Sequence, residues 1–207
     1  MTYDFSIIGV LKEGFRRSDG VKMTFAGSVI IYAIIALFVN SLVEFIFPYS
    51  EELISIYASS TVEMLFTLPI LIGIMILGVK HSREEELSIP SIFEYFGMIM
   101  PIMLAYVAMT VIISIGFVLL IIPGIYFAVS YAFVYQLIVD KGLNVWEAME
   151  LSRKTVTKQW FKFFGLSLLS GISILVSALP FGIGLIWSIP MVYITYGLLY
   201  HHLFDDE

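Results

Sequence analysis

The sequence predicts an all-α polytopic membrane protein in which six transmembrane helices form three hairpins. Hydrophobic residues make up 59% of its 207 residues and the mean hydropathy is +0.95, whereas a soluble domain is roughly 45–50% apolar. Six apolar stretches divide the chain, and a helix needs about 20 residues to cross the hydrocarbon core. The connections between these stretches alternate between basic segments and segments without Lys or Arg. Six spans leave no room for a separate soluble domain, so residues 1–207 are expected to form a single membrane domain.

The basic connections give the direction of each span. The spans are expected at Phe25–Phe47, Val62–Val79, Met98–Ile121, Ile125–Val139, Phe163–Leu179 and Leu185–Tyr200. The basic connections are the N-terminal arm, Lys80–Glu86 and Asp140–Lys162, and those without Lys or Arg are Pro48–Ser60, Pro123–Gly124 and Pro180–Gly182. Lys and Arg in short connections stay in the cytoplasm. All eleven of them therefore fall on the cytoplasmic side, and both chain termini are expected there.

An amphipathic segment precedes the first hairpin. Its apolar residues recur at helical spacing, at Phe5, Ile8, Leu11 and Phe15. A helix of this kind lies in the membrane interface with its apolar face buried. We therefore expect a cytoplasmic interfacial helix before the first outward span.

The second hairpin has the same kind of beginning. Ser91 and Glu94 have the spacing of a capping box, which predicts a helix start before Tyr95 and Phe96. The outward and inward spans of this hairpin are separated by Pro123–Gly124, so a tight turn is expected there.

The third hairpin follows a longer amphipathic segment. Asn144 is expected to cap its helix, with Glu147 three residues later. One face of this helix is predicted to carry Val145, Trp146, Met149, Val156 and Trp160. The order of interfacial helix, outward span, turn and inward span thus occurs three times, which predicts a threefold repeat over residues 5–79, 90–139 and 144–200. Such repeats occur in transport folds, but simple duplication also produces them.

The basic segment around the third interfacial helix is the first candidate functional surface. Lys and Arg near the membrane attract anionic lipid headgroups at roughly 1 kcal/mol each. The residues expected to contact lipid or a protein partner are Trp146, Arg153, Lys154, Lys158, Trp160 and Lys162. A solvated charged face is the simpler interpretation of the same residues.

Polar residues inside the spans form the second candidate set. They are Asn40, Glu44, Tyr131, Ser173 and Tyr193. Polar groups at membrane depth can line the path of a solute, but they also hydrogen-bond between packed helices. Both interpretations remain open from the sequence.

Catalytic and cofactor motifs do not stand out. The chain has no Cys, which removes disulfides, thiolate metal ligands and cysteine nucleophiles. His81, His201 and His202 fall at span ends without carboxylates at metal-ligand spacing. We expect no metal, no cofactor, no nucleic-acid partner and no enzymatic activity.

Three runs of sequence resemble a known group of proteins. They are Leu120-Ile-Ile-Pro-Gly-Ile-Tyr126 within Phe117–Asp140, Glu147-Ala-Met-Glu-Leu-Ser152-Arg-Lys154 and Trp160-Phe-Lys-Phe-Phe-Gly165. They are similar to the bacterial six-span membrane proteins related to the YciC-like and glycerophosphoryl diester phosphodiesterase membrane-domain group. The resemblance covers mainly residues 88–200. It implies a bacterial inner-membrane location and a link to lipid or envelope processes. The phosphodiesterase barrel of some relatives is absent, so no catalytic residues carry over.

The leading hypothesis is a non-enzymatic inner-membrane protein that acts through lipid or partner contact at the cytoplasmic interface. The main alternative is a small-solute transporter or channel, which requires a continuous polar cavity. A lipid-modifying enzyme ranks third and requires titratable groups that converge, with His81, Asp140 and His201 as the candidates. A homo-oligomer is compatible with the small residues on the spans.

Overall fold

The computed structural model describes residues 4–46 and 53–205, with only the backbone of residues 53–58. All regular structure in this part of the chain is helical, which confirms the all-α class. In order, its elements are α1 (Ile7–Arg17), α2 (Lys22–Ile46), α3 (Leu53–Ser82), the 3-10 helix η1 (Ile89–Met98), α4 (Ile99–Leu119), α5 (Ile121–Ser130), α6 (Val134–Lys141), α7 (Val145–Thr157), α8 (Trp160–Ala178) and α9 (Leu185–Phe204).

Five segments of the described chain are long and apolar enough to cross a membrane. They are Lys22–Ile46, Ser59–Ser82, Ile89–Leu119, Ile121–Lys141 and Trp160–Ala178. The sixth predicted span is also a helix, α9, but its Tyr, His, Ser and Thr residues make it less apolar than these five. Other helices of the protein cover much of α9. Many of its side chains therefore contact protein, where polar groups can be accommodated, and not the outside of the molecule.

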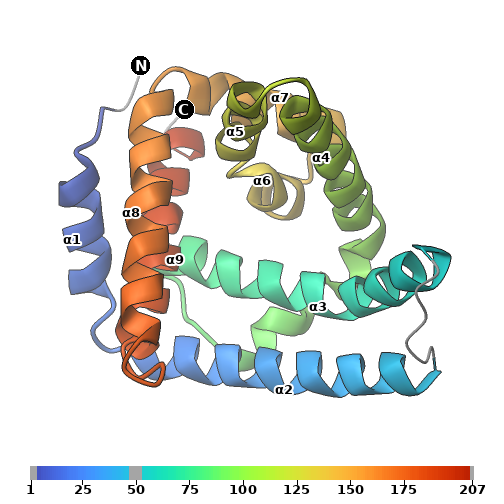
Figure 1. Ribbon diagram of the computed structural model, residues 1–207. Helices are drawn as coiled ribbons and strands as arrows, with labels where there is room; N and C mark the ends of the chain where they lie inside the picture. Colours follow the sequence, from blue (N-terminus) through green and yellow to red (C-terminus); the bar gives the residue numbers. More distant parts are fainter. Residues whose placement is uncertain (1–3, 47–52, 206–207) are drawn as a thin grey trace.

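The helices do not form a simple bundle with parallel axes. Figure 1 shows α2 and α3 running alongside each other, while α1 and α8 stand crosswise to them at one end. Helix α3 supplies much of the core, including Ile70, Ile72, Ile74 and Leu77. It crosses α9 at two glycines so closely that a Cβ atom on Gly197 would lie 2.1 Å from the carbonyl oxygen of Gly78.

The first unit differs from its prediction at both ends. Helix α1 buries Val10 and Gly14 against α9, while the predicted apolar residues Ile8 and Phe15 are exposed on another side of the helix; Phe5 lies before the helix and is buried, so it does not belong to that side. Small residues let α1 approach α9 closely, which turns the bulkier ones outward. Helix α3 begins at Leu53, inside the connection predicted at Pro48–Ser60. Residues 47–52, with the end of the predicted first span, lie outside the described residues.

The second unit departs further from its prediction. Its capping box is not formed, because the Ser91 hydroxyl donates to the carbonyl oxygen of Ser88 at 2.8 Å and the segment is a 3-10 helix. The turn between the spans lies at Leu120, which is extended, and not at Pro123–Gly124. Pro123 fits inside the first turn of α5 because the amide hydrogen that it lacks has no helical partner there.

The predicted fourth span is divided into two helices. Helix α5 ends at Ser130 and α6 begins at Val134. The Ser152 hydroxyl on α7 donates to the carbonyl oxygen of Ser130 at 2.8 Å and accepts from the amide of Phe133 at 3.3 Å. One side chain from a later helix thus satisfies backbone groups on both sides of the break.

The third unit keeps its predicted start but not its predicted face. Asn144 caps α7, since its side-chain oxygen accepts from the amide of Glu147 at 2.9 Å, which confirms the cap. The residues that α7 buries are Ala148, Met149, Ser152 and Val156. Trp146 is 70% exposed and Trp160 belongs to α8, so the predicted grouping of these two tryptophans is wrong.

Candidate functional site

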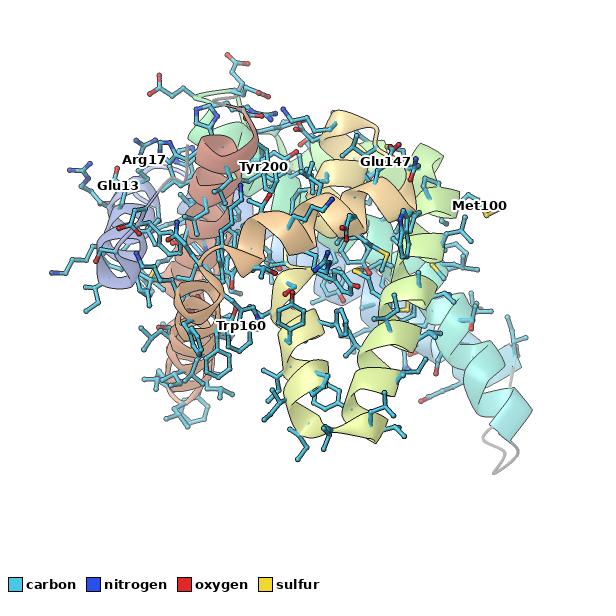
Figure 2. The ribbon with its side chains drawn as sticks, turned by 90° about the horizontal axis from the view of Figure 1, so that it is seen from above. Glu13, Arg17, Met100, Glu147, Trp160 and Tyr200 are labelled. Atoms are coloured by element: carbon cyan, nitrogen blue, oxygen red, sulfur yellow. The ribbon has the colours of Figure 1, made fainter. Side chains whose placement is uncertain are left out.

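Charged and polar side chains from the C-terminal ends of α3, α6 and α9 meet in one place. This end cluster comprises Arg83, Asp140, Lys141, Tyr200, His201 and Asp205. Figure 2 shows Tyr200 on α9, between α1 and the remaining helices. The predicted inward spans two, four and six end at this cluster.

Arg83 is the centre of the end cluster. Its Nη1 and Nη2 donate to the two carboxylate oxygens of Asp140 at 2.6 and 2.7 Å. Its Nε and Nη2 donate to the two carboxylate oxygens of Asp205 at 2.7 and 2.9 Å. The guanidinium also lies 5.9 Å from the centre of the Tyr200 ring. Paired bonds of this kind fix the geometry of an ion pair as well as strengthening it.

The two carboxylates have further donors. The Tyr200 hydroxyl donates to Asp140 Oδ2 at 2.8 Å. Lys141 Nζ and His201 Nδ1 both contact Asp205, the latter at 2.9 Å. Burial works to raise the pKa of Asp205, but hydrogen bonds from Arg83, Lys141 and His201 outweigh it and hold this pKa well below its usual range. Asp205 is therefore an ionised acceptor at neutral pH.

This arrangement is suited to joining helix ends. Every carboxylate oxygen of Asp140 and Asp205 accepts a charge-assisted or hydroxyl hydrogen bond, so neither is poised to take a proton. Of the three titratable candidates for lipid chemistry, Asp140 and His201 join the cluster. His81 instead contacts the carbonyl oxygen of Arg17 at 2.9 Å. Among the described residues, no group of three or more His, Asp or Glu is placed to hold a metal ion.

The predicted lipid-contact residues divide into an exposed set and a set engaged within the protein. Trp146, Lys154 and Lys158 are exposed. Arg153 donates to Glu150 at 2.9 Å, Trp160 Nε1 donates to the carbonyl oxygen of Tyr126 at 3.3 Å, and Lys162 contacts Asp4 and the carbonyl oxygen of Phe5.

Glu150 lies between two cations on the outer side of α7. Hydrogen bonds from Arg153 and Lys154 lower its pKa to about 2. Lys154 lies 3.2 Å from this carboxylate and is still exposed. In Figure 2, α7 lies across the face toward the viewer, with Glu147 near one end and Trp160 just beyond the other. The exposed side of α7 therefore presents an aromatic ring and two lysines.

The predicted polar path is not assembled in the structure. Asn40 and Glu44 are exposed on α2, whose buried residues at this end are Val39 and Val43. The remaining three path residues lie in separate surroundings. Tyr131 is buried and stacks on Phe127, the Ser173 hydroxyl donates within α8 to the carbonyl oxygen of Leu169, and Tyr193 stacks on Phe25.

Of the six residues of the end cluster, the sequence indicated only Asp140 and His201 as candidates; Arg83, Lys141, Tyr200 and Asp205 were not selected. All four lie at or just beyond the ends of predicted inward spans, and this position was the only available signal. This chain matches no protein-family model, no curated protein and no solved structure. Its function must therefore be inferred from its fold and contacts.

Proposed function

We propose that the protein is a non-enzymatic inner-membrane protein with six spans that contacts anionic lipid through the exposed side of α7. The observation that supports it best is the exposure of Trp146, Lys154 and Lys158 on a helix whose other side is fully buried. Aromatic rings and lysines together are typical of the headgroup region of a membrane.

The contacts between helix ends support the proposed topology. The cytoplasmic ends expected for spans two, four and six meet at Arg83, Asp140 and Asp205. Lys80 and Glu94, from the ends expected for spans two and three, lie 3.1 Å apart. Both α3 and Ile121–Lys141 can cross a membrane, and α9 ends beside them. With 20 residues, α9 is about 30 Å long, which is suited to a sixth span.

The test compares lipid retention by two lysine variants. Full-length protein is placed in phosphatidylcholine nanodiscs with added phosphatidylglycerol, and native mass spectrometry measures which lipid stays bound. Lys154→Gln with Lys158→Gln should lower the preference for phosphatidylglycerol roughly tenfold, because each lysine near the surface contributes about 1 kcal/mol and Lys154 is shared with Glu150. Lys162 is left unchanged because it contacts Asp4.

Arginine at the same two positions is the matched control. Lys154→Arg with Lys158→Arg keeps the charge and should keep the preference. If the glutamine variant retains phosphatidylglycerol as well as the natural protein does, α7 is not the lipid surface. A bound protein or second copy lost only from the glutamine variant would assign the surface to a protein partner instead.

A further inference from the structure

Helix α2 is the least covered of the five candidate spans in the described chain. Only 11% of its most apolar window is buried inside the protein, against 61% for Ser59–Ser82 and 50% for Ile121–Lys141. Figure 1 shows α2 along the lower edge of the molecule, with α3 alongside it on the inner side. The residues that α2 buries are Phe25, Ser28, Val39 and Val43. Most of its surface therefore faces lipid or another protein.

The uncovered side of α2 carries residues with the spacing of a coiled coil. This α2 stripe consists of Ile30, Ala33, Leu37, Asn40 and Glu44, which follow one another at alternating steps of three and four residues. All five are exposed. Such spacing keeps the residues on one side of a helix and is typical of the seam between two helices that cross at a small angle.

Asn40 is a polar residue on this lipid-facing side. Helix α2 has 25 residues and is about 38 Å long, whereas the hydrocarbon core is about 30 Å thick. Asn40 lies about 9 Å before the end of α2, so it falls inside the hydrocarbon when α2 crosses the membrane. Its side-chain amide has no hydrogen-bond partner among the described residues. Acyl chains offer no donor or acceptor, so an amide at this depth requires a protein partner.

A second copy of the chain can supply that partner. Copies inserted in the same direction have parallel α2 helices, and a twofold axis between them places each residue of the α2 stripe opposite itself. An amide both donates and accepts, so two facing Asn40 side chains are complementary. One Asn in such a seam also specifies the register of the two helices. We propose that two copies of this protein pair through the α2 stripe, with Asn40 bonded to Asn40 of the second copy.

The two ends of the α2 stripe limit the contact. At one end, Ile30 borders an apolar groove of about 200 Å³ that it shares with Ile186 on α9, so α9 leaves Ile30 uncovered. At the other end, Glu44 lies two residues before the end of α2, at the edge of the hydrocarbon. Two facing carboxylates repel each other. The pairing therefore depends on the section from Ile30 to Asn40.

The absence of Cys from the chain allows a direct test by cross-linking. The variants Ala33→Cys and Leu37→Cys lie on the α2 stripe. Ile34→Cys and Phe38→Cys are matched controls, because these residues are also exposed on the same turns but lie off the stripe. Full-length protein in its native membrane is oxidised with copper phenanthroline and analysed by non-reducing electrophoresis. A disulfide requires Cα atoms within about 7 Å, so linked dimers should form from the stripe variants and not from the controls. Equal linkage of all four variants, or none, overturns the proposal.

A second experiment tests the Asn40 amide itself. Fluorescence energy transfer between labelled copies of the full-length protein in phosphatidylcholine liposomes measures the dissociation constant of the dimer. Asn40→Leu should weaken the dimer about tenfold, as the loss of a hydrogen bond between membrane helices predicts. Asn40→Gln keeps the amide and should pair like the natural protein, as should Phe38→Leu. If Asn40→Leu pairs as tightly as the natural protein, Asn40 does not join the copies.

The proposed dimer does not depend on the lipid surface of α7. Lys154 and Lys158 lie on a different helix from the α2 stripe. Lys154→Gln with Lys158→Gln should therefore lower lipid retention and leave the dissociation constant of the dimer unchanged, whereas Asn40→Leu should do the reverse. Failure of either proposal can thus be recognised independently, and a dimer lost with the two lysines would overturn pairing through α2.

Discussion

Replacing Arg83 with Gln should destabilise the protein more than any other change to a single charge at the helix ends. Arg83 makes four charge-assisted hydrogen bonds. The side chains of Arg83, Asp140 and Asp205 are 22%, 14% and 13% exposed. After the replacement, Asp205 keeps Lys141 and His201, but Asp140 keeps only the Tyr200 hydroxyl and Lys141 at 3.9 Å.

The expected loss lies between the values for buried and for exposed ion pairs. Removing one partner of a buried pair costs about 3–5 kcal/mol, whereas an exposed pair contributes about 1 kcal/mol or less. Because Arg83 is still partly exposed, the free energy of unfolding of the Arg83→Gln variant should fall by about 3 kcal/mol, at the lower end of the buried range. For a chain of this size, the midpoint of thermal unfolding should fall by roughly 6–12 °C.

The assay is thermal unfolding of the full-length protein in detergent micelles, followed by circular dichroism. Arg16→Gln is the control, because Arg16 is 77% exposed and its pair with Glu13 should contribute about 0.5 kcal/mol. Arg83→Lys keeps the charge without the paired geometry and should give an intermediate value. If Arg83→Gln and Arg16→Gln unfold at the same temperature, the end cluster does not stabilise the fold and the reasoning fails.

Three further predictions concern acid stability, close packing and topology. The pKa of Asp205 is depressed in the folded protein. Its contribution to the free energy of unfolding is therefore constant above about pH 5 and is lost as the pH falls below the ordinary pKa of about 4. Asp205→Asn should remove this part of the acid dependence in unfolding measurements. Gly197→Ala should abolish the folded state, because its Cβ atom would clash with the backbone of α3. Gly171→Ala has open space around it and should stabilise the protein by about 0.5–1 kcal/mol. Equal thermal midpoints for the two variants would contradict the close crossing of α3 and α9. Since the chain has no Cys, a cysteine at Phe181 should react with a membrane-impermeant thiol reagent on intact cells and one at Lys158 should not, and the reverse result would invert the proposed topology.

The sequence contained enough information for the positions of most helices, because apolar stretches and local caps are local properties. The cap at Asn144 needs only Glu147, three residues away, and both were identified. The break between α5 and α6 depends on Ser152, which lies on another helix and contacts both sides of it. No pattern within residues 125–139 marks that break, so the segment was predicted as a continuous helix, although Ile121–Lys141 remains long and apolar enough for one span.

The candidate site was harder to predict for the same reason. The alternation of basic connections placed the ends of spans two, four and six on one side, but it could not show that Arg83 bonds both Asp140 and Asp205. Trp146 is exposed, as its predicted contact with lipid requires, but the packing of Trp160 against Tyr126 depends on another helix and was not predicted. Which side of α7 is covered depends on α4, α5, α6 and α8.

The end cluster also implies an order of events during synthesis. Arg83 is made 57 residues before Asp140 and 122 residues before Asp205. At about 5–20 residues per second, Arg83 waits several seconds for its first partner and roughly twice as long for its second. During this interval it is a hydrated cation, which in the proposed topology holds the end of α3 on the cytoplasmic side. In the proposed topology, Arg83 thus first helps to orient α3 and later joins the end of α3 to those of α6 and α9.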